Sequence, residues 1–430
     1  MVSCPTVQAQ FFSNSRAVGG IDISPEGILA NAATDNLDKL SQLRRQHLQE
    51  VPADIKQMAD SRKVSLRRLE QAIQQAGNDA DKLPDEIKYL AGLQQIRYIF
   101  VYPELRDIVL VGPGEGWKVD PRGNVVGITT GRPVMLLDDL LVALRTARQA
   151  ANGGISCSID PNRQRLAQLQ TIRPRPGDDP QQLAAELRDV LGPQEISVSG
   201  VPPSTHFARV LVAADYRMKR LGMGLEKSPV PGLPSYMSMI KGNRRGANLL
   251  GPRWWLEPNY DPLLRSPDGL AWELRGASAK AMTEQDFVAA SGNVQRGGMA
   301  DPMAQKWAEN MTNKFDELAV AEPIFGQLRN CMELAIVAAL VVKEDLTAKA
   351  GYSMPLLLDP ADLIVEQFPA PKQVATQTNV LKNGRGWVIS ASGGVQVNSW
   401  YVADRVQQSD APAPVRARAT PRENSNWWWN

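Results

Sequence analysis

Residues 323–346 restrict the fold of this chain more than any other segment. Apolar side chains occupy almost every position, and the few polar ones lie mainly near the start of the segment. A helix that is apolar on nearly all sides has to be covered on nearly all sides. A membrane-surface helix would carry basic residues along one whole face, but none occurs between Arg329 and Lys343. We therefore expect a helix in a soluble core, lying under both an aromatic hairpin at 253–274 and the C-terminal strands.

The size and charge of the chain exclude two classes of partner. Its 430 residues, 43% of them hydrophobic, can bury one large core or two to three ordinary ones. The 48 basic and 46 acidic residues give a net charge of +2, which supplies no field for nucleic acid or an anionic membrane. The longest strongly apolar run, 334–342, is well short of the ~20 residues that span a bilayer. We expect no nucleic-acid partner and no membrane span.

Cysteine and histidine are too sparse for most metal chemistry. Cys4, Cys157 and Cys331 form no CxxC pair and are odd in number. They predict neither a disulfide framework nor a zinc cluster, and they leave one long-range bridge open. His47 and His206 are the only histidines, which excludes HExxH and most catalytic zinc geometries. We expect no metal and no cofactor.

Residues 110–133, LVGPGEGWKVDPRGNVVGITTGRP, are rich in glycine like a phosphate-binding loop. Such a loop leads into a helix N-terminus, and a P-loop also needs Lys followed by Ser or Thr. Here the spacing is GxGxG, and the chain continues as strand. We predict a β-hairpin with arms at 117–120 and 125–129, and no nucleotide. Its turn has the residues preferred in type I turns, as do those at 24–27 and 266–269, so three hairpins are expected.

The distribution of Pro, Gly and periodic segments divides the chain into five regions. Residues 1–95 form a hairpin and helical module, 96–225 an α/β region, 226–250 a Pro- and Gly-rich linker or loop, 251–405 a C-terminal α+β region, and 406–430 a disordered tail. The predicted fold class is α+β or mixed α/β, with β-hairpins in the middle region and with a β-hairpin, buried helices and antiparallel strands in the C-terminal region.

Two predicted helices of the middle region carry polar residues beside their apolar faces. The first buries a row of leucines, so Asp138 and Asp139 are interpreted as solvated or capping residues rather than as an acid pair. The second is capped by Ser204 or Thr205, which places His206 in the capping turn. No GxSxG motif supports a catalytic serine beside this histidine.

The aromatic and acidic hairpin at 253–274 is the strongest candidate for a site. Aromatic rings stack on sugar or peptide faces, and two carboxylates ~5 to 10 Å apart can hydrolyse glycosides. The ligand-binding candidates are Trp254, Trp255, Tyr260 and Trp272, and the catalytic candidates are Glu257, Asp261 and Glu273. Because neighbouring strand residues point to opposite faces, we expect one of Trp254 and Trp255 in the core and the other outward. Core packing and a ligand platform both stay open for the aromatic set.

The chain as given finishes NSNWWWN, with Trp427, Trp428 and Trp429 on the tail predicted to be disordered. Aromatic residues on a mobile tail need a partner surface or become an aggregation hazard. We interpret this run as a docking peptide for a partner. A truncation after Arg405 is then expected to leave the melting temperature nearly unchanged.

Six phrases of the sequence carry a resemblance to a known family. They are GGIDISPEGIL, GEGWKVDPRGNVVGITTGRPVMLLDDLLVALR, GISCSIDP, VPPSTHFARVLVAADYRMKRLGMGLE, RSPDGLAWELRG and EPIFGQLRNCMELAIVAAL. In this order they resemble a planctomycetal family known only as a domain of unknown function. The resemblance implies an exported, periplasmic or envelope-associated protein with no assigned activity and no catalytic residues to carry over. The start MVSCPTVQAQFF lacks the features of a signal peptide, so either the protein is cytoplasmic or the start shown is not that of the precursor.

Two classes of function follow from these observations. The first is a non-catalytic binding or scaffold protein of the bacterial cell envelope, with an unknown protein or glycan partner. The alternative is a hydrolase that acts on glycan or peptide through Glu257, Asp261 and Glu273. Carboxylates converging in one deep pocket favour the enzyme, and separated carboxylates on an exposed sheet favour the binding protein.

Overall fold

The structure is a computed structural model that describes most of the chain. The described residues are 20–32, 46, 48–168, 179–240, 252–276, 278–288, 294–298, 302–377, 379, 382–383, 386–387, 391–421 and 426–430. Cys4 and His47 lie outside the described residues, and so do residues 241–250 of the predicted linker.

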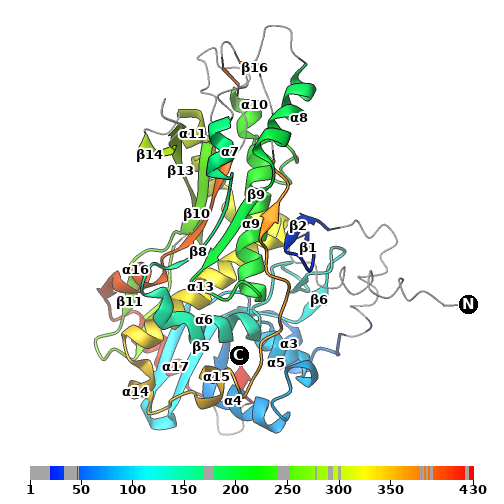
Figure 1. Cartoon of the computed structure of the whole chain (residues 1–430). Helices are drawn as coiled ribbons and strands as arrows, with labels where there is room; N and C mark the ends of the chain where they lie inside the picture. The colour runs from blue at the N-terminus through cyan, green and yellow to red at the C-terminus, as the bar shows by residue number, and fades with distance from the viewer. Residues whose placement is uncertain are drawn as a thin grey trace, which may run out of the picture.

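Two mixed β-sheets with helices between them make an α+β fold, as the sequence predicts (Figure 1). Within the described residues, the first sheet has nine strands in the order β1-β2-β15-β9-β8-β18-β10-β13-β14. The second has seven strands in the order β19-β11-β12-β4-β5-β3-β20. In Figure 1 the nine-stranded sheet lies in the upper part of the molecule and the seven-stranded sheet in the lower part.

The nine-stranded sheet has one apolar and one polar face. Its strands are β1 (Ile21–Ile23), β2 (Ile28–Asn31), β15 (Gln373–Val374), β9 (Gln194–Ser199), β8 (Ile155–Asp160), β18 (Ser392–Val397), β10 (Pro252–Pro258), β13 (Ala279–Val288) and β14 (Val294–Gly298). Only the pairs β10–β18 and β15–β2 are parallel among these described strands. In β8, buried Ile155, Cys157 and Ile159 alternate with partly exposed Ser156 and Ser158. Such alternation is typical of a sheet with one face on the core.

The seven-stranded sheet is more deeply enclosed. Its strands are β19 (Val406–Gln408), β11 (Leu263–Arg265), β12 (Ala271–Glu273), β4 (Tyr98–Tyr102), β5 (Asp107–Gly114), β3 (Ala59–Ser65) and β20 (Trp428–Trp429). Every residue of β5 is buried. A continuous apolar strand of this kind is covered on both faces.

Helix α13 (Pro323–Lys343) is the buried helix expected from the sequence. From Pro323 to Val341 every residue except Gln327 is buried. Its main neighbours are α6 (Leu137–Ala150), α9 (His206–Gly222), α12 (Phe315–Ala321) and α16 (Ser399–Asp404). The burial is confirmed, but helices provide most of the cover that we expected from a hairpin and strands.

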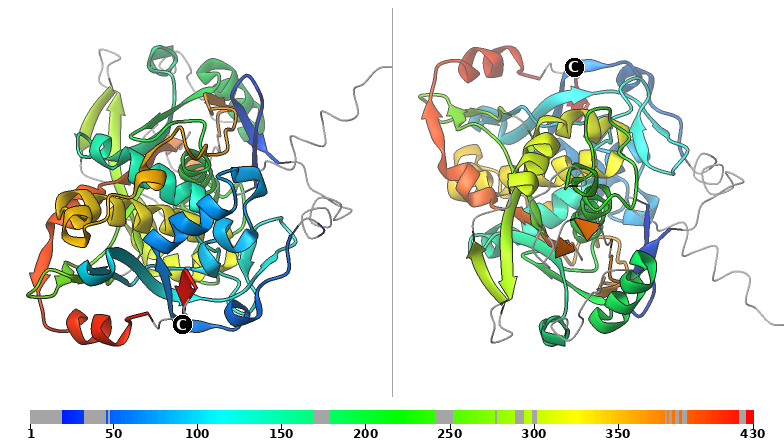
Figure 2. Two further views of the ribbon diagram at one scale, coloured as in Figure 1. Left: turned by 90° about the horizontal axis from the view of Figure 1, so that it is seen from below. Right: turned by 90° about the horizontal axis from the view of Figure 1, so that it is seen from above.

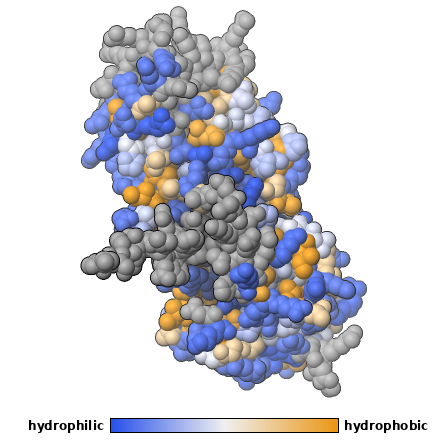
Figure 3. Space-filling model, turned by 90° about the vertical axis from the view of Figure 1, so that its right-hand side faces the viewer, coloured by the Kyte–Doolittle hydropathy of each residue, from blue (hydrophilic) through white to orange (hydrophobic). Residues whose placement is uncertain are grey.

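The position of α13 accounts for its apolar composition. By length and composition alone this helix could cross a membrane, and 94% of its most apolar window is buried inside the molecule. The side of the molecule in Figure 3 is mainly hydrophilic, with apolar residues in small separate groups. The apolar side chains of α13 therefore pack inside the molecule.

Several predicted helices begin and pack as expected. In α6 the leucines at 137, 140, 141 and 144 are buried. Thr205 is the N-cap of α9, where its hydroxyl accepts a hydrogen bond from the backbone N–H of Ala208 at 3.3 Å. Further helices are α3 (Ala53–Lys56), α4 (Leu66–Gln75), α7 (Arg163–Gln168), α8 (Pro180–Leu191), α10 (Tyr236–Ile240), α11 (Pro302–Asn313), α14 (Leu346–Ala350), α15 (Pro355–Leu358) and α17 (Pro412–Arg418).

All three predicted turns join the two strands of a hairpin, but the third hairpin is shorter than predicted. The pairs β1–β2 and β6 (Trp117–Val119) with β7 (Val125–Gly127) form around their predicted turns. At 253–274, however, only β11 and β12 form a hairpin, and β10 belongs to the other sheet. Pro258 is the last residue of β10 and Pro262 directly precedes β11, and proline has no N–H for a strand ladder.

The sheets combine strands from different predicted regions. The nine-stranded sheet takes β1 from the first region, β8 and β9 from the second and β10 from the fourth. The predicted boundaries at 95, 225 and 250 therefore do not separate the two sheets, and the division into folding units stays a prediction. Inside the helical module, residues 59–65 form strand β3 because they pair with β5, which overrides the local helical pattern.

The C-terminal segment from Val406 is folded, and the prediction of a disordered tail is wrong for its described residues. β19 pairs with β11 and β20 pairs with β3. Helix α17 and Trp429 contact a buried cluster on the outer face of the seven-stranded sheet, and this segment (red in Figure 2) runs along the outside of the molecule. That cluster consists of Phe100, Tyr102, Val109, Val111, Ala271 and Ala419.

The tryptophans of this segment dock on their own chain. Trp427 and Trp428 are buried, and Nε1 of Trp428 donates a hydrogen bond to the Asp54 carboxylate at 2.9 Å. Nε1 of Trp429 donates to the carbonyl oxygen of Ala419 at 3.0 Å. Strand β3, helix α3 and the end of α17 thus provide the surface on which these residues dock.

Candidate functional site

The candidate site is the polar face of the nine-stranded sheet, which we call the open face. Register between adjacent strands places its side chains on one side of β9, β8, β18, β10 and β13. They are Ser156, Ser158, Asp160, Glu195, Ser197, Ser199, Arg253, Trp255, Glu257, Lys280, Met282, Glu284, Ser392 and Gln396. Each of them is partly or fully exposed.

Helices α9 and α11 pack on the other face of this sheet. Nζ of Lys219 in α9 donates to the backbone oxygens of Ile159 at 2.8 Å and Gly393 at 3.1 Å. The ring of Trp307 in α11 lies 4.2 Å from the ring of Trp254, centroid to centroid. Trp254 is fully buried while Trp255 is partly exposed, which confirms the prediction that the two rings point to opposite faces.

Paired serine hydroxyls form the centre of one half of the open face. Ser156 Oγ lies 2.9 Å from Ser199 Oγ, and Ser158 Oγ lies 2.8 Å from Ser197 Oγ. Each pair uses one of its two O–H donors and one of its four lone pairs. One donor and three lone pairs per pair are left for water or a ligand.

Trp255 occupies the other half of the open face. Its Nε1 donates a hydrogen bond to Glu257 Oε1 at 2.5 Å, two residues along the same strand. This bond satisfies the only polar atom of the indole and fixes its orientation. The ring is therefore held as a rigid, partly exposed apolar surface.

Two glycines of β18 join the halves. A Cβ on Gly393 would lie 1.7 Å from the backbone oxygen of Trp254, and one on Gly394 would lie 1.8 Å from that of Cys157. Real Cβ atoms do not approach so closely, so the sequence must have glycine at both positions for β8 and β10 to flank this strand. As a result no side chain stands between Ser158 and Trp255, which both pair with Gly394.

Charged side chains surround this neutral centre in opposite-sign pairs. Arg253 Nη1 lies 3.9 Å from Asp160 Oδ1, and Lys280 Nζ lies 3.7 Å from Glu257 Oε2. Glu195, which accepts a hydrogen bond from Asn162 at 2.8 Å, and Glu284 add negative charge. The defined open face thus has an excess of carboxylates over cations.

The structure brings only two of the seven predicted site residues together on this face, Trp255 and Glu257. Trp254 and Trp272 are fully buried, and Tyr260 is 5% exposed. The hydroxyl of Tyr260 donates to Glu333 Oε1 at 3.2 Å in the interior. These three aromatic side chains pack in the core, which is the first of the two alternatives for the aromatic set, core packing and a ligand platform.

The three predicted acids have different surroundings. Glu257 is on the open face, whereas Glu273 is on β12 of the other sheet and accepts a hydrogen bond from the hydroxyl of Tyr98 at 3.4 Å. Asp261 is exposed on the segment between β10 and β11. The acids belong to two sheets and a connecting segment, so they do not form the convergent pair expected of a glycosidase.

A second polar cluster lies at the N-terminus of α9. Nδ1 of His206 is 3.0 Å from the Asp139 carboxylate, and the backbone N–H of Glu366 donates to Asp138 at 3.4 Å. Burial and the neighbouring Asp139 charge raise the pKa of Asp138 to about 6. Burial alone would lower the pKa of His206, but the Asp139 and Asp138 carboxylates outweigh it and raise that pKa. Asp139 is therefore the partner of His206. Asp138 and Asp139 were both predicted to be solvated or capping residues, and for the buried Asp139 this prediction is wrong.

Two further acids are buried away from any surface. Burial raises the pKa of Asp215 to about 7 against the opposing effect of Lys219, which lies 2.8 Å away. Burial likewise raises the pKa of Glu333 to about 7, although Arg329 and a hydrogen bond from the backbone N–H of Ile96 favour its charged form. Within the described residues no three His, Cys, Asp or Glu side chains gather to hold a metal ion. Cys157 and Cys331 are both buried free thiols, so the bridge left open between them is not formed.

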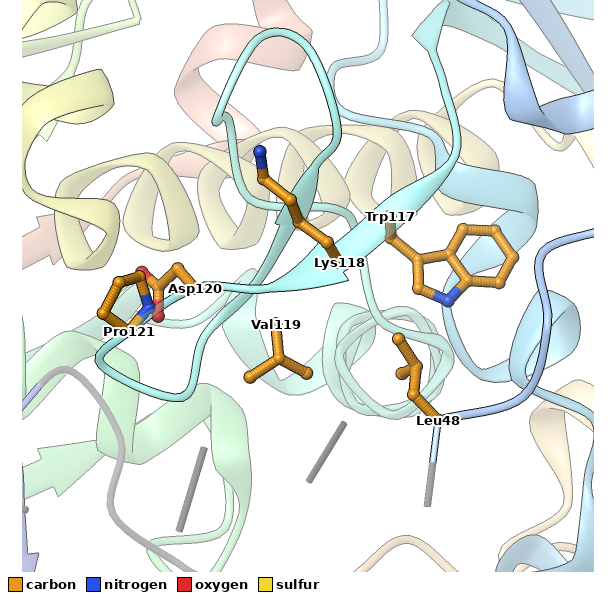
Figure 4. A pocket seen from close by; sticks show the side chains of 6 residues that line it. All are labelled: Leu48, Trp117, Lys118, Val119, Asp120 and Pro121. Carbon is orange, nitrogen blue, oxygen red and sulfur yellow. The ribbon is translucent and has the colours of Figure 1, made fainter. Parts of the chain in front are cut away.

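A hollow of about 460 Å³ lies beside the β6–β7 hairpin (Figure 4). Leu48, Trp117, Val119 and Pro121 give it an apolar lining, with Lys118 and Asp120 at its edge. Nζ of Lys118 donates one of its three N–H groups to the backbone oxygen of Ile128 at 2.7 Å. Among the described residues that line the hollow there is no pair of acids and no nucleophile with a base beside it.

Residues 157–236 cover most of β8, all of α7, α8, β9 and α9, and the first residue of α10. They match a family model described as a protein of unknown function, DUF1598. This match confirms the resemblance to a domain of unknown function, and a planctomycetal origin stays a prediction. No curated protein and no solved structure matches the chain. The matched segment contributes three of the four paired serines of the open face, Ser158, Ser197 and Ser199.

Sequence reasoning missed the serines of this face. Their signal is the alternation of serine with apolar residues in ISCSI and ISVS. Each stretch alone predicts only an amphipathic strand. The register that sets the two stretches side by side is a tertiary property.

Proposed function

We propose that this chain is a non-catalytic binding protein whose ligand lies on the open face of the nine-stranded sheet. The observation that carries the proposal is the rigid, partly exposed Trp255 beside a row of paired serines, on the face opposite helices α9 and α11. Partly exposed aromatic rings with convergent polar groups are the usual components of a binding surface.

The hydrolase alternative has less support. A hydrolase of the predicted kind needs two carboxylates on either side of one bond. Glu257 bonds to Trp255 and lies near Lys280, while Glu273 is on the other sheet. Separated carboxylates on an exposed sheet are what the binding alternative expects.

We also propose that the protein acts in the bacterial envelope, either in the periplasm or on the cell surface. Its support is the resemblance described for the six sequence phrases. Fractionation of native cells with mass spectrometry of the mature N-terminus tests this part. Recovery of the protein in the cytoplasmic fraction with the N-terminus shown would refute it.

The binding proposal is tested with glycan and peptide arrays probed with the purified chain and with two variants. Ser158→Lys puts a charge in the centre of the open face, and Ser353→Lys puts the same charge on an exposed loop before α15 as a control. We expect array signals that Ser158→Lys removes and Ser353→Lys leaves unchanged. Turnover of a bound ligand that Glu257→Gln or Glu273→Gln abolishes would instead establish the hydrolase.

A further inference from the structure

We propose that the ligand of the open face is an uncharged glycan chain that crosses strands β9, β8, β18 and β10, with one sugar ring stacked on Trp255. This inference rests on the proposed function and specifies its ligand class. The path follows the row of paired residues Ser197, Ser158, Gly394 and Trp255.

The chemistry of this row fits a sugar. The face of an indole ring carries negative charge density, so it attracts the C–H groups on the face of a pyranose ring. Since Nε1 of Trp255 is bonded to Glu257, the ring contributes its apolar surface alone. The serine pairs offer both O–H donors and lone pairs, as a ligand with many hydroxyls requires.

The shape of the row fits a chain rather than a compact ligand. Gly394 puts no side chain between Trp255 and Ser158, so the path from the indole to the serine pairs is not blocked by a side chain. Neighbouring strands are ~4.8 Å apart, so four strands present contacts over roughly 15 Å. A ligand of several linked rings is needed to use them all.

The composition of the row argues against a protein partner. The centre of a protein interface is enriched in aromatic residues, Met and Arg and depleted in Ser. Its binding energy is concentrated in clustered aromatic and Arg anchors. Here a single Trp lies on β10 and the four serines lie beyond β18 on β8 and β9, and Arg253 Nη1 lies 3.9 Å from Asp160 Oδ1.

The charge of the face argues against anionic ligands. Among the described residues of the face, the two cations, Arg253 and Lys280, each lie near a carboxylate, and Glu195 and Glu284 add further negative charge. Nucleic acids and acidic polysaccharides require a surplus of Lys and Arg. An uncharged chain meets no such repulsion.

The test is affinity electrophoresis of the full chain in native gels containing a β-glucan, a galactomannan or starch, with alginate and pectate gels for comparison. We expect retardation in at least one neutral gel and none in the anionic gels. Trp255→Ala is expected to weaken binding at least about tenfold, as measured by the Kd from gels of graded polysaccharide concentration. Trp255→Tyr keeps an aromatic face and is expected to retain most of the affinity. The control Tyr401→Ala removes a 63% exposed ring on α16 and is expected to change nothing.

Circular dichroism establishes which variants fold, and Ser158→Lys replaces Trp255→Ala if the latter does not. Retardation only in anionic gels, or in neutral gels with full affinity in both face variants, refutes the glycan assignment. If no polysaccharide binds but a peptide array gives signals that Ser158→Lys abolishes, the glycan class is wrong and the open face remains a binding site. If neither glycans nor peptides show dependence on the open face, the proposed function fails as well.

Discussion

Replacing Trp428 by Ala tests whether the C-terminal segment belongs to the folded core. The Trp428 side chain is 6% exposed, and its ring contacts that of Trp427 at 4.4 Å between centroids. Truncating a buried Trp to Ala costs about 3–5 kcal/mol. The lost hydrogen bond to Asp54 adds little, because Asp54 is exposed and regains water. We therefore expect the free energy of unfolding to fall by about 4 kcal/mol.

Scanning calorimetry gives the corresponding change in melting temperature. An unfolding entropy of about 2.1 cal/mol/K per residue, scaled to 430 residues, is about 0.9 kcal/mol/K. For a two-state transition, 4 kcal/mol then lowers the melting temperature by about 4–5 °C. Truncation after Arg405 removes β19, α17 and β20 together, so we expect a larger decrease.

The exposed Tyr401→Ala serves again as the control, with no expected change in melting temperature. If Trp428→Ala and the truncated chain both melted like the parent, the docking of β20 on β3 would contribute nothing to stability. The segment from Val406 would then behave as the removable tail that its composition predicts.

Three further predictions follow from buried groups. Ala338→Asp puts an unpaired carboxylate among the packed side chains around α13, and it should lower the free energy of unfolding, measured in urea, by several kcal/mol. Val320→Asp, at a 42% exposed position, should lower it little. Equal losses of stability in the two variants would contradict the burial of α13. Because the pKa of Glu333 is raised to about 7, the folded state holds its proton more tightly than the unfolded state, so the contribution of Glu333 to stability is full below about pH 4.5 and is lost as pH rises through 7. The stability of the parent relative to Glu333→Gln should fall by about 3 kcal/mol between pH 4 and 8, and a pH-independent difference would refute the shift. Gly394→Ala should destabilise the protein far more than Gly131→Ala, whose cost is about 1 kcal/mol. A Cβ at position 394 would lie 1.8 Å from the Cys157 oxygen, whereas a Cβ at position 131 would have nothing within 4 Å. Similar melting temperatures of the two variants would refute the close approach at Gly394.

Local patterns predicted the elements that depend on near neighbours. The turns at 24–27 and 120–123, the Thr205 cap and the apolar character of α13 each require only a few consecutive residues. For the same reason the opposite orientations of Trp254 and Trp255 followed from strand geometry alone.

Distant pairing explains what the sequence did not show. The predicted hairpin at 253–274 was divided because β10 finds partners in β13 and β18, and β12 finds one in β4. The polar segment after Val406 looked disordered because its apolar partners, Phe100 and Tyr102 among them, lie about 300 residues earlier. Of the predicted site residues, Trp255 and Glu257 reach the open face, and the serines beside them come from two other strands.

The pairing of β20 with β3 also constrains the order of events during synthesis. β3 spans Ala59–Ser65, and its edge partner Trp428–Trp429 is more than 360 residues away in the sequence. A ribosome adds ~5 to 20 residues per second, so the edge of β3 lacks this partner for roughly 20 to 70 seconds. Unpaired strand edges are templates for aggregation. We expect nascent chains stalled before residue 428 to depend on chaperones far more than chains that have passed it.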